Sequence, residues 1–202
     1  MASVVVPFRG ADPKQRLDPV PQHERMRLAL AMLADVLDAA VAVSPTFVVA
    51  PGGLELPAGV MSVDDPLRGQ GAAVQAGLDA ALAAGAPGPY LVVNADLPCA
   101  TARDLLALAG AVPDRGLALV AAADNTTNAL AFADAALFES CYGPGSADRF
   151  AALANTHGVR ANSVDAPNLI DDVDTLADLA RVASRLRSRT RRVFETLQAE
   201  AA

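Results

Sequence analysis

The sequence has few of the residues on which several structural classes depend. Only two of its 202 residues are cysteines, Cys99 and Cys141, and they form neither a disulfide framework nor a metal-binding motif. No uncharged apolar run reaches the roughly 20 residues that span a bilayer. The short N-terminal run Val4–Val6 lacks the basic lead-in of a signal peptide. We therefore expect a reduced, soluble, cytoplasmic protein that does not bind membranes.

Common catalytic motifs are absent as well. The two histidines, His23 and His157, lie far apart and have no metal-ligand spacing. No Ser-His-Asp or Cys-His arrangement can be recognised, and the Walker A pattern is missing. A chemistry that depends on an activated serine or cysteine nucleophile is therefore not expected.

Charge is sparse and mostly negative. The net charge of −7 argues against a nucleic-acid coat, because that function requires a basic face. Residues 1–27 nevertheless carry five basic side chains against three acidic ones. Lys14 is the only lysine among the 16 Lys and Arg residues. A functional need for a compact ammonium group is one interpretation, and chance is the more ordinary one. A locally positive segment on an acidic protein suits a small anionic ligand.

The hydrophobic pattern predicts an α/β protein. Hydrophobic residues make up 52% of the chain, which excludes intrinsic disorder, and the length suits one domain over residues 1–202. The expected strands are Ser3–Pro7, Thr46–Ala50, Val60–Val63, Tyr90–Asn94, Leu117–Ala122, Asn128–Ala133 and Asn168–Ile170. The expected helices are Gln22–Val43, Ala72–Ala84, Thr101–Ala109, Gly145–Asn155 and a long terminal helix, Thr175–Ala199. This alternation indicates a three-layer α/β/α fold with a mostly parallel sheet.

Ligands of such sheets bind beyond the carboxyl ends of the strands, at a switch in strand order. The loop after the first strand contains Gly10, which permits a tight turn, and the cations Lys14 and Arg16. Cations and loop amides near a helix start suit a polyphosphate. A simple exposed basic loop is the alternative.

Two segments supply carboxylates. Asp96 directly follows a buried strand, where an ionised group needs a cation or hydrogen-bond donors. Asp171, Asp172 and Asp174 form a second cluster, in which Asp172 and Asp174 point to the same side of an extended chain. Both segments suit a divalent metal. Asp96 and Asp174 could alternatively cap the helices that follow them.

Two polar loops and a basic terminus complete the candidates. Thr127 and Ser146 offer hydroxyl groups for a phosphate or carboxylate, although a simple N-cap at Ser146 is the more ordinary interpretation. Six arginines gather near the end of the chain: Arg181, Arg185, Arg187, Arg189, Arg191 and Arg192. We interpret them as a solvated face that favours the dipole at the C-terminus of the terminal helix, with a partner or ligand surface as the alternative.

Five segments occur in the order seen in the CofC/FbiD guanylyltransferases, which the chain resembles along nearly its whole length. They are Lys14–Leu17, Asn94–Pro98, Thr127–Leu130, Tyr142–Ser146 and Asp172–Thr175. Each motif alone occurs in other nucleotidyltransferases. The combination of Thr-Asn-Ala-Leu with Gly-Pro-Gly-Ser is the specific part.

The resemblance implies a GT-A-like fold, a single nucleotidyltransferase domain over residues 1–202, and transfer of GMP from GTP to phosphoenolpyruvate or 2-phospho-L-lactate. Pyrophosphate would be released in a step of coenzyme F-420 biosynthesis. The implied catalytic residues are Lys14, Arg16 and Asp96, of which the first two would bind the GTP phosphates. The implied ligands of Mg²⁺ are Asp96, Asp172 and Asp174. The implied binding residues for the three-carbon acid are Thr127, Gly143 and Ser146.

Three positions depart from the family pattern. Gly71 stands where an Asn is common, Asp124–Thr126 replaces a Gly-Thr-Gly, and Phe8–Pro13 precedes Lys14 in place of a Val-Lys start. Other hypotheses are a nucleotidyltransferase for another phosphorylated cofactor precursor, a GT-A enzyme that transfers sugars, and a non-catalytic nucleotide-binding module. The sequence leaves open the acceptor, the residues that select guanine, the number of metal ions and the oligomeric state, a homodimer included.

Overall fold

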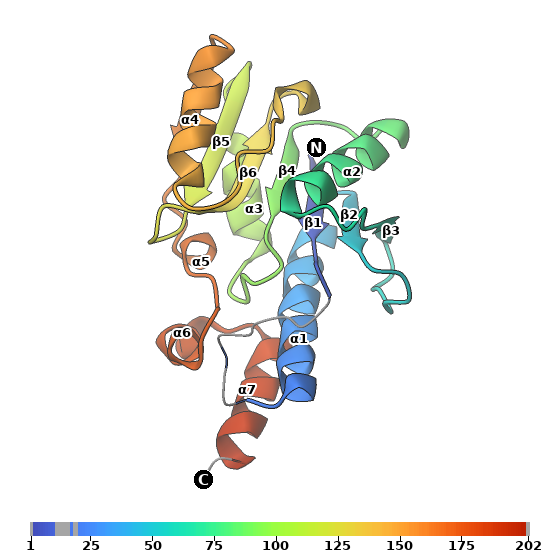
Figure 1. Cartoon of the computed structure of the whole chain (residues 1–202), viewed down its shortest axis with the longest axis vertical. Helices are drawn as coiled ribbons and strands as arrows, with labels where there is room; N and C mark the ends of the chain where they lie inside the picture. Colours follow the sequence, from blue (N-terminus) through green and yellow to red (C-terminus); the bar gives the residue numbers. More distant parts are fainter. Residues whose placement is uncertain (1, 11–16, 18–19, 201–202) are drawn as a thin grey trace.

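A computed structural model describes residues 2–10, 17 and 20–200 of the chain. These residues form a seven-stranded sheet in the order β3-β2-β1-β4-β6-β5-β7 (Figure 1). The strands are β1 (Ser3–Pro7), β2 (Thr46–Ala50), β3 (Val60–Asp64), β4 (Tyr90–Val93), β5 (Gly116–Ala121), β6 (Thr127–Phe132) and β7 (Arg160–Ser163). β6 is antiparallel to β4 and β5, and the other neighbouring pairs are parallel. The expected mostly parallel sheet is confirmed.

Helices cover both faces of this sheet. They are α1 (Gln22–Val41), α2 (Gln70–Ala83), α3 (Ala102–Gly110), α4 (Ser146–Thr156), α5 (Pro167–Ile170), α6 (Leu176–Val182) and α7 (Ser188–Glu200), with 3-10 turns η2 (Ala135–Leu137) and η3 (Ala183–Arg185). One core cluster joins α1 and α3 to the sheet, and a second joins α2 and α4 to its other face (Figure 1). The three-layer α/β/α arrangement is therefore confirmed. None of the helices in the described part of the chain is long and apolar enough to cross a membrane.

α1 is buried on two sides. Leu33 and Leu37 belong to the core between α1 and the sheet, as the helical spacing predicts. Leu28 and Met32 belong instead to a third cluster with α6, α7 and Leu17. A helix between two layers needs a wider apolar surface than a single stripe, and the many alanines and leucines of α1 provide it.

Two expected elements are wrong, and one strand was not predicted. Asn168–Ile170 is not a strand but part of α5, because Pro167 at the first helical position presets helical backbone. The final strand is β7, which was not predicted because its residues are mostly exposed and lack an apolar run. The long terminal helix is interrupted before α7: the N–H of Arg187 donates to the carbonyl of Pro98 (3.1 Å) and Leu186 is buried.

This interruption also overturns the interpretation of the arginine-rich end. Arg189, Arg191 and Arg192 lie in the first half of α7, and its last turn contains no basic residue. They therefore do not favour the dipole at the helix C-terminus. Arg181, Arg185 and Arg189 form ion pairs with aspartates and are not simply solvated.

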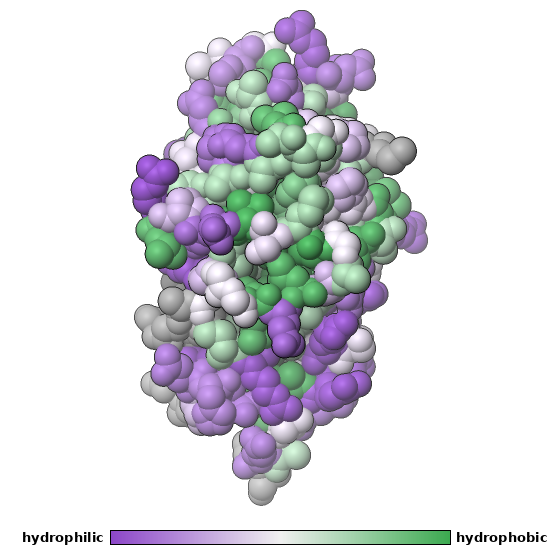
Figure 2. All heavy atoms as spheres, turned by 90° about the vertical axis from the view of Figure 1, so that its right-hand side faces the viewer, coloured by the Kyte–Doolittle hydropathy of each residue, from purple (hydrophilic) through white to green (hydrophobic). Residues whose placement is uncertain are grey.

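Hydrophilic and apolar surfaces are unevenly distributed. Viewed from the side of β3 and α2, apolar side chains gather across the middle of the molecule, and hydrophilic ones gather toward both ends, including the end where α1 and α7 lie (Figure 2). Exposed large hydrophobic residues on β3, on α2 and between them include Met61, Leu67 and Leu82.

The start of α7 is tied to α1 by one buried carboxylate. Asp35 is 2% exposed and accepts hydrogen bonds from the backbone N–H groups of Arg189 (3.2 Å) and Thr190 (2.8 Å). The first N–H groups of a helix have no partner within it, so Asp35 caps α7 from a distant part of the sequence. This contact fixes the position of α7 against α1.

Replacing Asp35 with Ala should therefore lower the free energy of unfolding by about 1–3 kcal/mol, because two N–H groups lose their acceptor. The matched control is Asp38→Ala, which removes only an exposed pair with Arg189, worth about 1 kcal/mol or less. Urea unfolding followed by circular dichroism measures both. Equal and small effects of the two substitutions would show that Asp35 does not anchor α7.

Candidate active site at the switch in strand order

The strand order switches between β1 and β4. From β1 the chain continues to β2 and β3 on one side, whereas β4 lies on the other side. Because β6 is antiparallel, its first residues lie beside the end of β4: Val93 pairs with Ala129, and the N–H of Asn94 donates to the carbonyl of Asn128 (3.0 Å). The loop after β4 and the start of β6 therefore meet at the edge where ligands bind in such folds.

Three aspartates converge at this edge. Asp96, Asp172 and Asp174 each place a carboxylate oxygen within 4.8 Å of the other two. Asp172 and Asp174 share one side because Val173 between them is fully buried and its N–H donates to the carbonyl of Asp96 (3.1 Å). The expected common direction of Asp172 and Asp174 is confirmed. We call these three residues the aspartate cluster.

The electrostatics of the aspartate cluster favour a bound cation. Burial raises the pKa of the Asp172 carboxyl above its ordinary value, and the negative charges of Asp96 and Asp174 raise it further. A hydrogen bond from Asn128 acts in the opposite direction. Carboxylate oxygens are the ligands that hard divalent cations prefer, and a cation would relieve the mutual repulsion. The residues present therefore fit a divalent metal ion.

Asp171 does not join the cluster. It forms ion pairs with Arg181 and Arg185. Burial alone would raise the pKa of Asp171, but the hydrogen bonds and positive charges of these arginines outweigh it and lower the pKa. The expected acidic cluster of Asp171, Asp172 and Asp174 thus divides between an ion-pair network, which contains Asp171, and the aspartate cluster.

The capping alternatives for the cluster residues are wrong. Thr101 caps α3 and forms a capping box with Asp104, as the sequence predicts for Thr101. Thr175 caps α6 in the same way with Asp178, and these bonds together with Arg181 lower the pKa of Asp178 to about 2 against the effect of burial. Asp96 and Asp174 therefore do not serve as the N-caps of these helices.

A pair of buried hydroxyl groups lies next to the start of α4. The hydroxyls of Thr127 and Ser146 are 3.0 Å apart, and both residues are buried. Ser146 is not the N-cap: that residue is Gly145, in a left-handed conformation with φ of 69°. The N–H of Ser146 donates to the carbonyl of Gly143 (3.0 Å). The structure thus brings Thr127, Gly143 and Ser146 together.

Arg149 stabilises the conformation of the loop before α4. The sequence did not predict this role. Its guanidinium donates to the carbonyls of Cys141 (2.8 Å), Tyr142 (3.2 Å) and Pro144. Gly143 and Gly145 have φ of 112° and 69°, which other residues rarely adopt. A basic residue one turn after Gly-Pro-Gly-Ser is the only sequence signal, and it does not reveal three carbonyl partners.

Asn128 connects the start of β6 to the aspartate cluster. It is 2% exposed, and its amide donates to the carbonyl of Ile170 (2.9 Å) and to Asp172 Oδ1 (3.5 Å). Gln70 donates to Asn94 (2.9 Å), whose amide donates to the carbonyl of Thr127 (3.3 Å). Side-chain amides therefore connect the loop after β4 to the start of β6, and the start of β6 to the aspartate cluster. The sequence showed Asn128 within a motif but gave it no role.

The first loop is described only in part. Gly10 has φ of 68°, a conformation that glycine adopts readily and that is compatible with the expected tight turn after β1. Lys14 and Arg16, the expected phosphate-binding cations, lie outside the described residues. Leu17 is buried in the cluster with α6 and α7.

Gly71 at the start of α2 is explained by a close approach of the loop before α4. A Cβ at this position would lie 1.8 Å from Ser140 Oγ and 2.4 Å from Ser140 Cβ. An Asn, common here in the family that the sequence resembles, would require Ser140 to move. The departure at Gly71 therefore accompanies close packing of α2 against this loop.

Gly71→Ala should lower the free energy of unfolding by about 1–3 kcal/mol, since the added methyl overlaps Ser140. In a Ser140→Gly background the same substitution should be nearly neutral, because the nearest remaining atom is the Cα at 3.6 Å. A double-mutant cycle by thermal or urea unfolding measures the coupling. An equal effect in both backgrounds would contradict the close approach.

Asn128→Ala should weaken Mn²⁺ binding about tenfold, because Asp172 loses the amide that orients it. Electron paramagnetic resonance of free Mn²⁺ measures the affinity without any substrate. The control is Asn162→Ala, which removes an exposed amide that donates to the carbonyl of Ala111. Unchanged Mn²⁺ affinity in a folded Asn128→Ala protein would show that Asn128 does not position the cluster.

Comparisons with solved structures support a nucleotidyltransferase fold. A candidate nucleotide-diphospho-sugar transferase from Desulfovibrio desulfuricans has a TM-score of 0.78 at 15% identity, covering 98% of this chain and 95% of that one. The 2-C-methyl-D-erythritol 4-phosphate cytidylyltransferase from Thermus thermophilus has a TM-score of 0.52 at 18% identity, covering 88% and 95%. At these identities the similarity concerns the fold alone, and it confirms the fold that the resemblance implied.

Comparisons of sequence are more specific. A phosphoenolpyruvate guanylyltransferase from Sphaerobacter thermophilus is 36% identical over 172 residues, which cover 79% of this chain and 81% of the relative. A 2-phospho-L-lactate guanylyltransferase from Halomicrobium mukohataei is 38% identical over 182 residues, which cover 89% and 84%. Residues 2–186 match the family described as "Guanylyl transferase CofC like". The chain therefore belongs to the CofC guanylyltransferase family.

Proposed function

We propose that this chain transfers GMP from GTP to phosphoenolpyruvate or 2-phospho-L-lactate and releases pyrophosphate, as a step of coenzyme F-420 biosynthesis. The observation that carries the proposal is the aspartate cluster at the switch in strand order, which Asn128 links to the start of β6, where Thr127 and Ser146 form a buried hydroxyl pair. Such a site combines a place for a cation with donors for an anionic acceptor. The names of the relatives supply the substrates.

Asp96, Asp172 and Asp174 would hold Mg²⁺. Three carboxylate oxygens within 4.8 Å of one another match the preference of Mg²⁺ for oxygen ligands. When bound, the ion would offset the charge of the triphosphate and polarise the α-phosphate. Asn128 orients Asp172, and the buried Val173 keeps Asp172 and Asp174 on the same side.

Thr127, Gly143 and Ser146 would bind the phosphate and carboxylate of the three-carbon acid. The two hydroxyls can donate to an acceptor oxygen once they rotate away from each other, and Gly143 leaves the backbone accessible. Arg149 keeps the loop of Gly143 in shape through its bonds to backbone carbonyls. The acceptor is thereby oriented by groups that are fixed before it binds.

Lys14 and Arg16 would bind the phosphates of GTP. Both residues follow β1, whose carboxyl end lies beside that of β4 at the switch in strand order. We propose that Lys14 and Arg16, together with Asp96, are the catalytic residues, and that residues 1–202 act as one nucleotidyltransferase domain. Two cations on the developing pyrophosphate stabilise the leaving group.

The acceptor needs no general base. A phosphate monoester with its second pKa near 6 is largely a dianion at pH 7. One of its oxygens forms a bond to the α-phosphorus of GTP while the bond from that phosphorus to the bridging oxygen breaks, and pyrophosphate leaves. Two unit charges 4 Å apart repel by roughly 1 kcal/mol even in water. The task of the site is therefore to offset charge and orient the reactants.

The test is release of pyrophosphate from GTP and Mg²⁺ with each of the two acids, with the product identified by mass. We expect release with at least one acid and a product that joins GMP to it. Asp96→Asn should lose at least about a hundredfold in rate, because it removes a charged ligand of the ion. The matched control is Asp79→Asn, on the exposed face of α2.

Equal rates for Asp96→Asn and Asp79→Asn would contradict the role of the aspartate cluster. Substitution of CTP for GTP and of other phosphorylated acceptors distinguishes a related nucleotidyltransferase. Binding of GTP without release of pyrophosphate from any acceptor would contradict an enzymatic function.

A further inference from the structure

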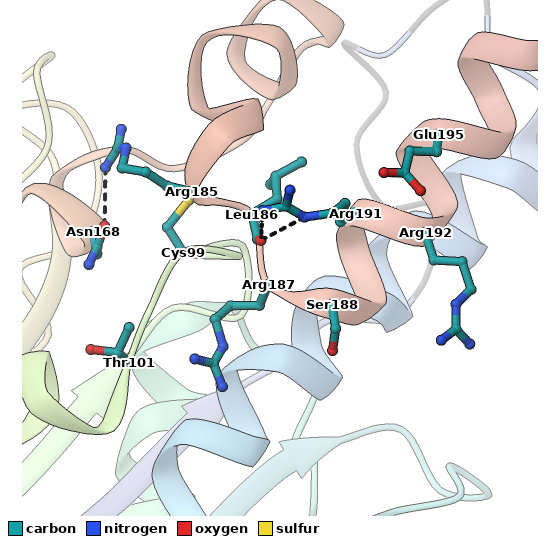
Figure 3. A pocket seen from close by; sticks show the side chains of 10 residues that line it. All are labelled: Cys99, Thr101, Asn168, Arg185, Leu186, Arg187, Ser188, Arg191, Arg192 and Glu195. Atoms are coloured by element: carbon teal, nitrogen blue, oxygen red, sulfur yellow. Dashed lines mark hydrogen bonds between the residues drawn. The ribbon is translucent and has the colours of Figure 1, made fainter.

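A large cleft lies apart from the aspartate cluster, between the start of α3, α5 and the start of α7 (Figure 3). Its volume is about 920 Å³. We call it the arginine cleft, because Arg185, Arg187, Arg191 and Arg192 line it. Glu195 is the one acidic residue among the described lining residues. This lining is strongly positive in a chain with a net charge of −7.

Two of these arginines are fixed by the fold. Arg185 pairs with Asp171 and donates to the carbonyl of Pro167 (2.9 Å) and to Asn168 Oδ1 (3.3 Å). Arg191 folds back onto Leu186, whose carbonyl accepts from its Nη2 (2.8 Å) and its Nε (3.3 Å) (Figure 3). Part of the wall therefore has its shape before any ligand binds.

The other two arginines, Arg187 and Arg192, have no acidic ion-pair partner among the described residues. Within residues 2–10, 17 and 20–200, no carboxylate forms an ion pair with Arg187 or Arg192, although Arg181, Arg185 and Arg189 nearby each have one. Both side chains are exposed and extend in the same general direction from the start of α7 (Figure 3). They are available to an anion from solution.

The stability of α7 does not explain why Arg191 and Arg192 occur at its start. Arg191 and Arg192 lie near the N-terminus of α7, where the helix dipole disfavours positive charge, and its first turn contains no acidic residue. The N–H groups of Arg189 and Thr190 are already satisfied by Asp35. A bound anion would compensate the charge of Arg192, for which the described residues provide no ion pair.

We propose that the arginine cleft binds a small molecule with at least two anionic groups, of the phosphorylated type, separately from the aspartate cluster. Guanidinium groups bind phosphate in a bidentate manner, and the volume falls within the range of small-molecule sites. A long polyanion fits less well, because the remainder of the protein is acidic. The segment of Asp171 and Asp172 separates the two places: Asp171 contacts Arg185, whereas Asp172 joins Asp96.

Arginine labelling resolved by residue tests the proposal in the unmodified protein. Phenylglyoxal labelling is followed by peptide mass spectrometry, with and without inorganic tripolyphosphate and in the absence of divalent metal. At ten times the dissociation constant, labelling of Arg187 and Arg192 should slow about tenfold, because only unoccupied sites react. Arg115 and Arg160, exposed at the other end of the sheet, should be labelled at an unchanged rate.

Calorimetry with matched variants gives a second measurement. Arg187→Gln/Arg192→Gln should lose a class of tripolyphosphate binding that Arg115→Gln/Arg160→Gln retains. Both double variants should release pyrophosphate from GTP with the KM of the unmodified protein, since neither pair belongs to the proposed catalytic groups. Sulfate at equal concentration should protect Arg187 and Arg192 less, because it provides one anionic group.

Three results would overturn the proposal. Labelling of Arg187 and Arg192 at an unchanged rate would show that the cleft binds no such anion, and equal protection of all four arginines would show non-specific binding. A KM for GTP that rises together with the loss of tripolyphosphate binding would place the cleft within the GTP site. The labelling experiment needs no turnover, so its outcome is independent of the proposed guanylyltransferase activity.

Discussion

The repulsion among three carboxylates is the constraint on which the rest of the site depends. Asp96, Asp172 and Asp174 lie within 4.8 Å of one another, and burial together with the charges of Asp96 and Asp174 raises the pKa of Asp172. Folding maintains this arrangement through buried contacts on either side, namely Val173 in the core and the amide of Asn128. An arrangement that is unfavourable without a counter-charge is typical of a functional site.

The sheet topology explains how segments that are distant in sequence come together at the aspartate cluster. The antiparallel β6 begins where β4 ends, so Thr127 and Asn128 lie at the same edge as the loop of Asp96. The segment after β7 returns through α5 to bring Asp172 and Asp174 to that edge. On the other side of this segment, Asp171 anchors Arg185 and a wall of the arginine cleft. Neighbouring residues of one short segment thus serve two separate electrostatic environments.

Much of the fold could be predicted because its core strands are continuous apolar runs and Thr101 caps α3 locally. β7 could not be predicted, because its mostly exposed side chains form no apolar pattern and its extended conformation depends on pairing with a neighbouring strand. The break before α7 depends on the carbonyl of Pro98 and on Asp35, both far away in sequence. In the site, the three clustered aspartates were recognisable in the sequence as candidate cation ligands, whereas Asn128 and Arg149 act through backbone carbonyls that no motif reveals.

The central claim is that these carboxylates, from two separate segments, hold one divalent ion at the switch in strand order. The most direct measurement is a crystal structure with Mn²⁺, with anomalous data collected at the manganese absorption edge. The account predicts an anomalous peak in contact with carboxylate oxygens of Asp96, Asp172 and Asp174. A peak bound elsewhere with this place empty, or the three side chains directed away from one another, would contradict it.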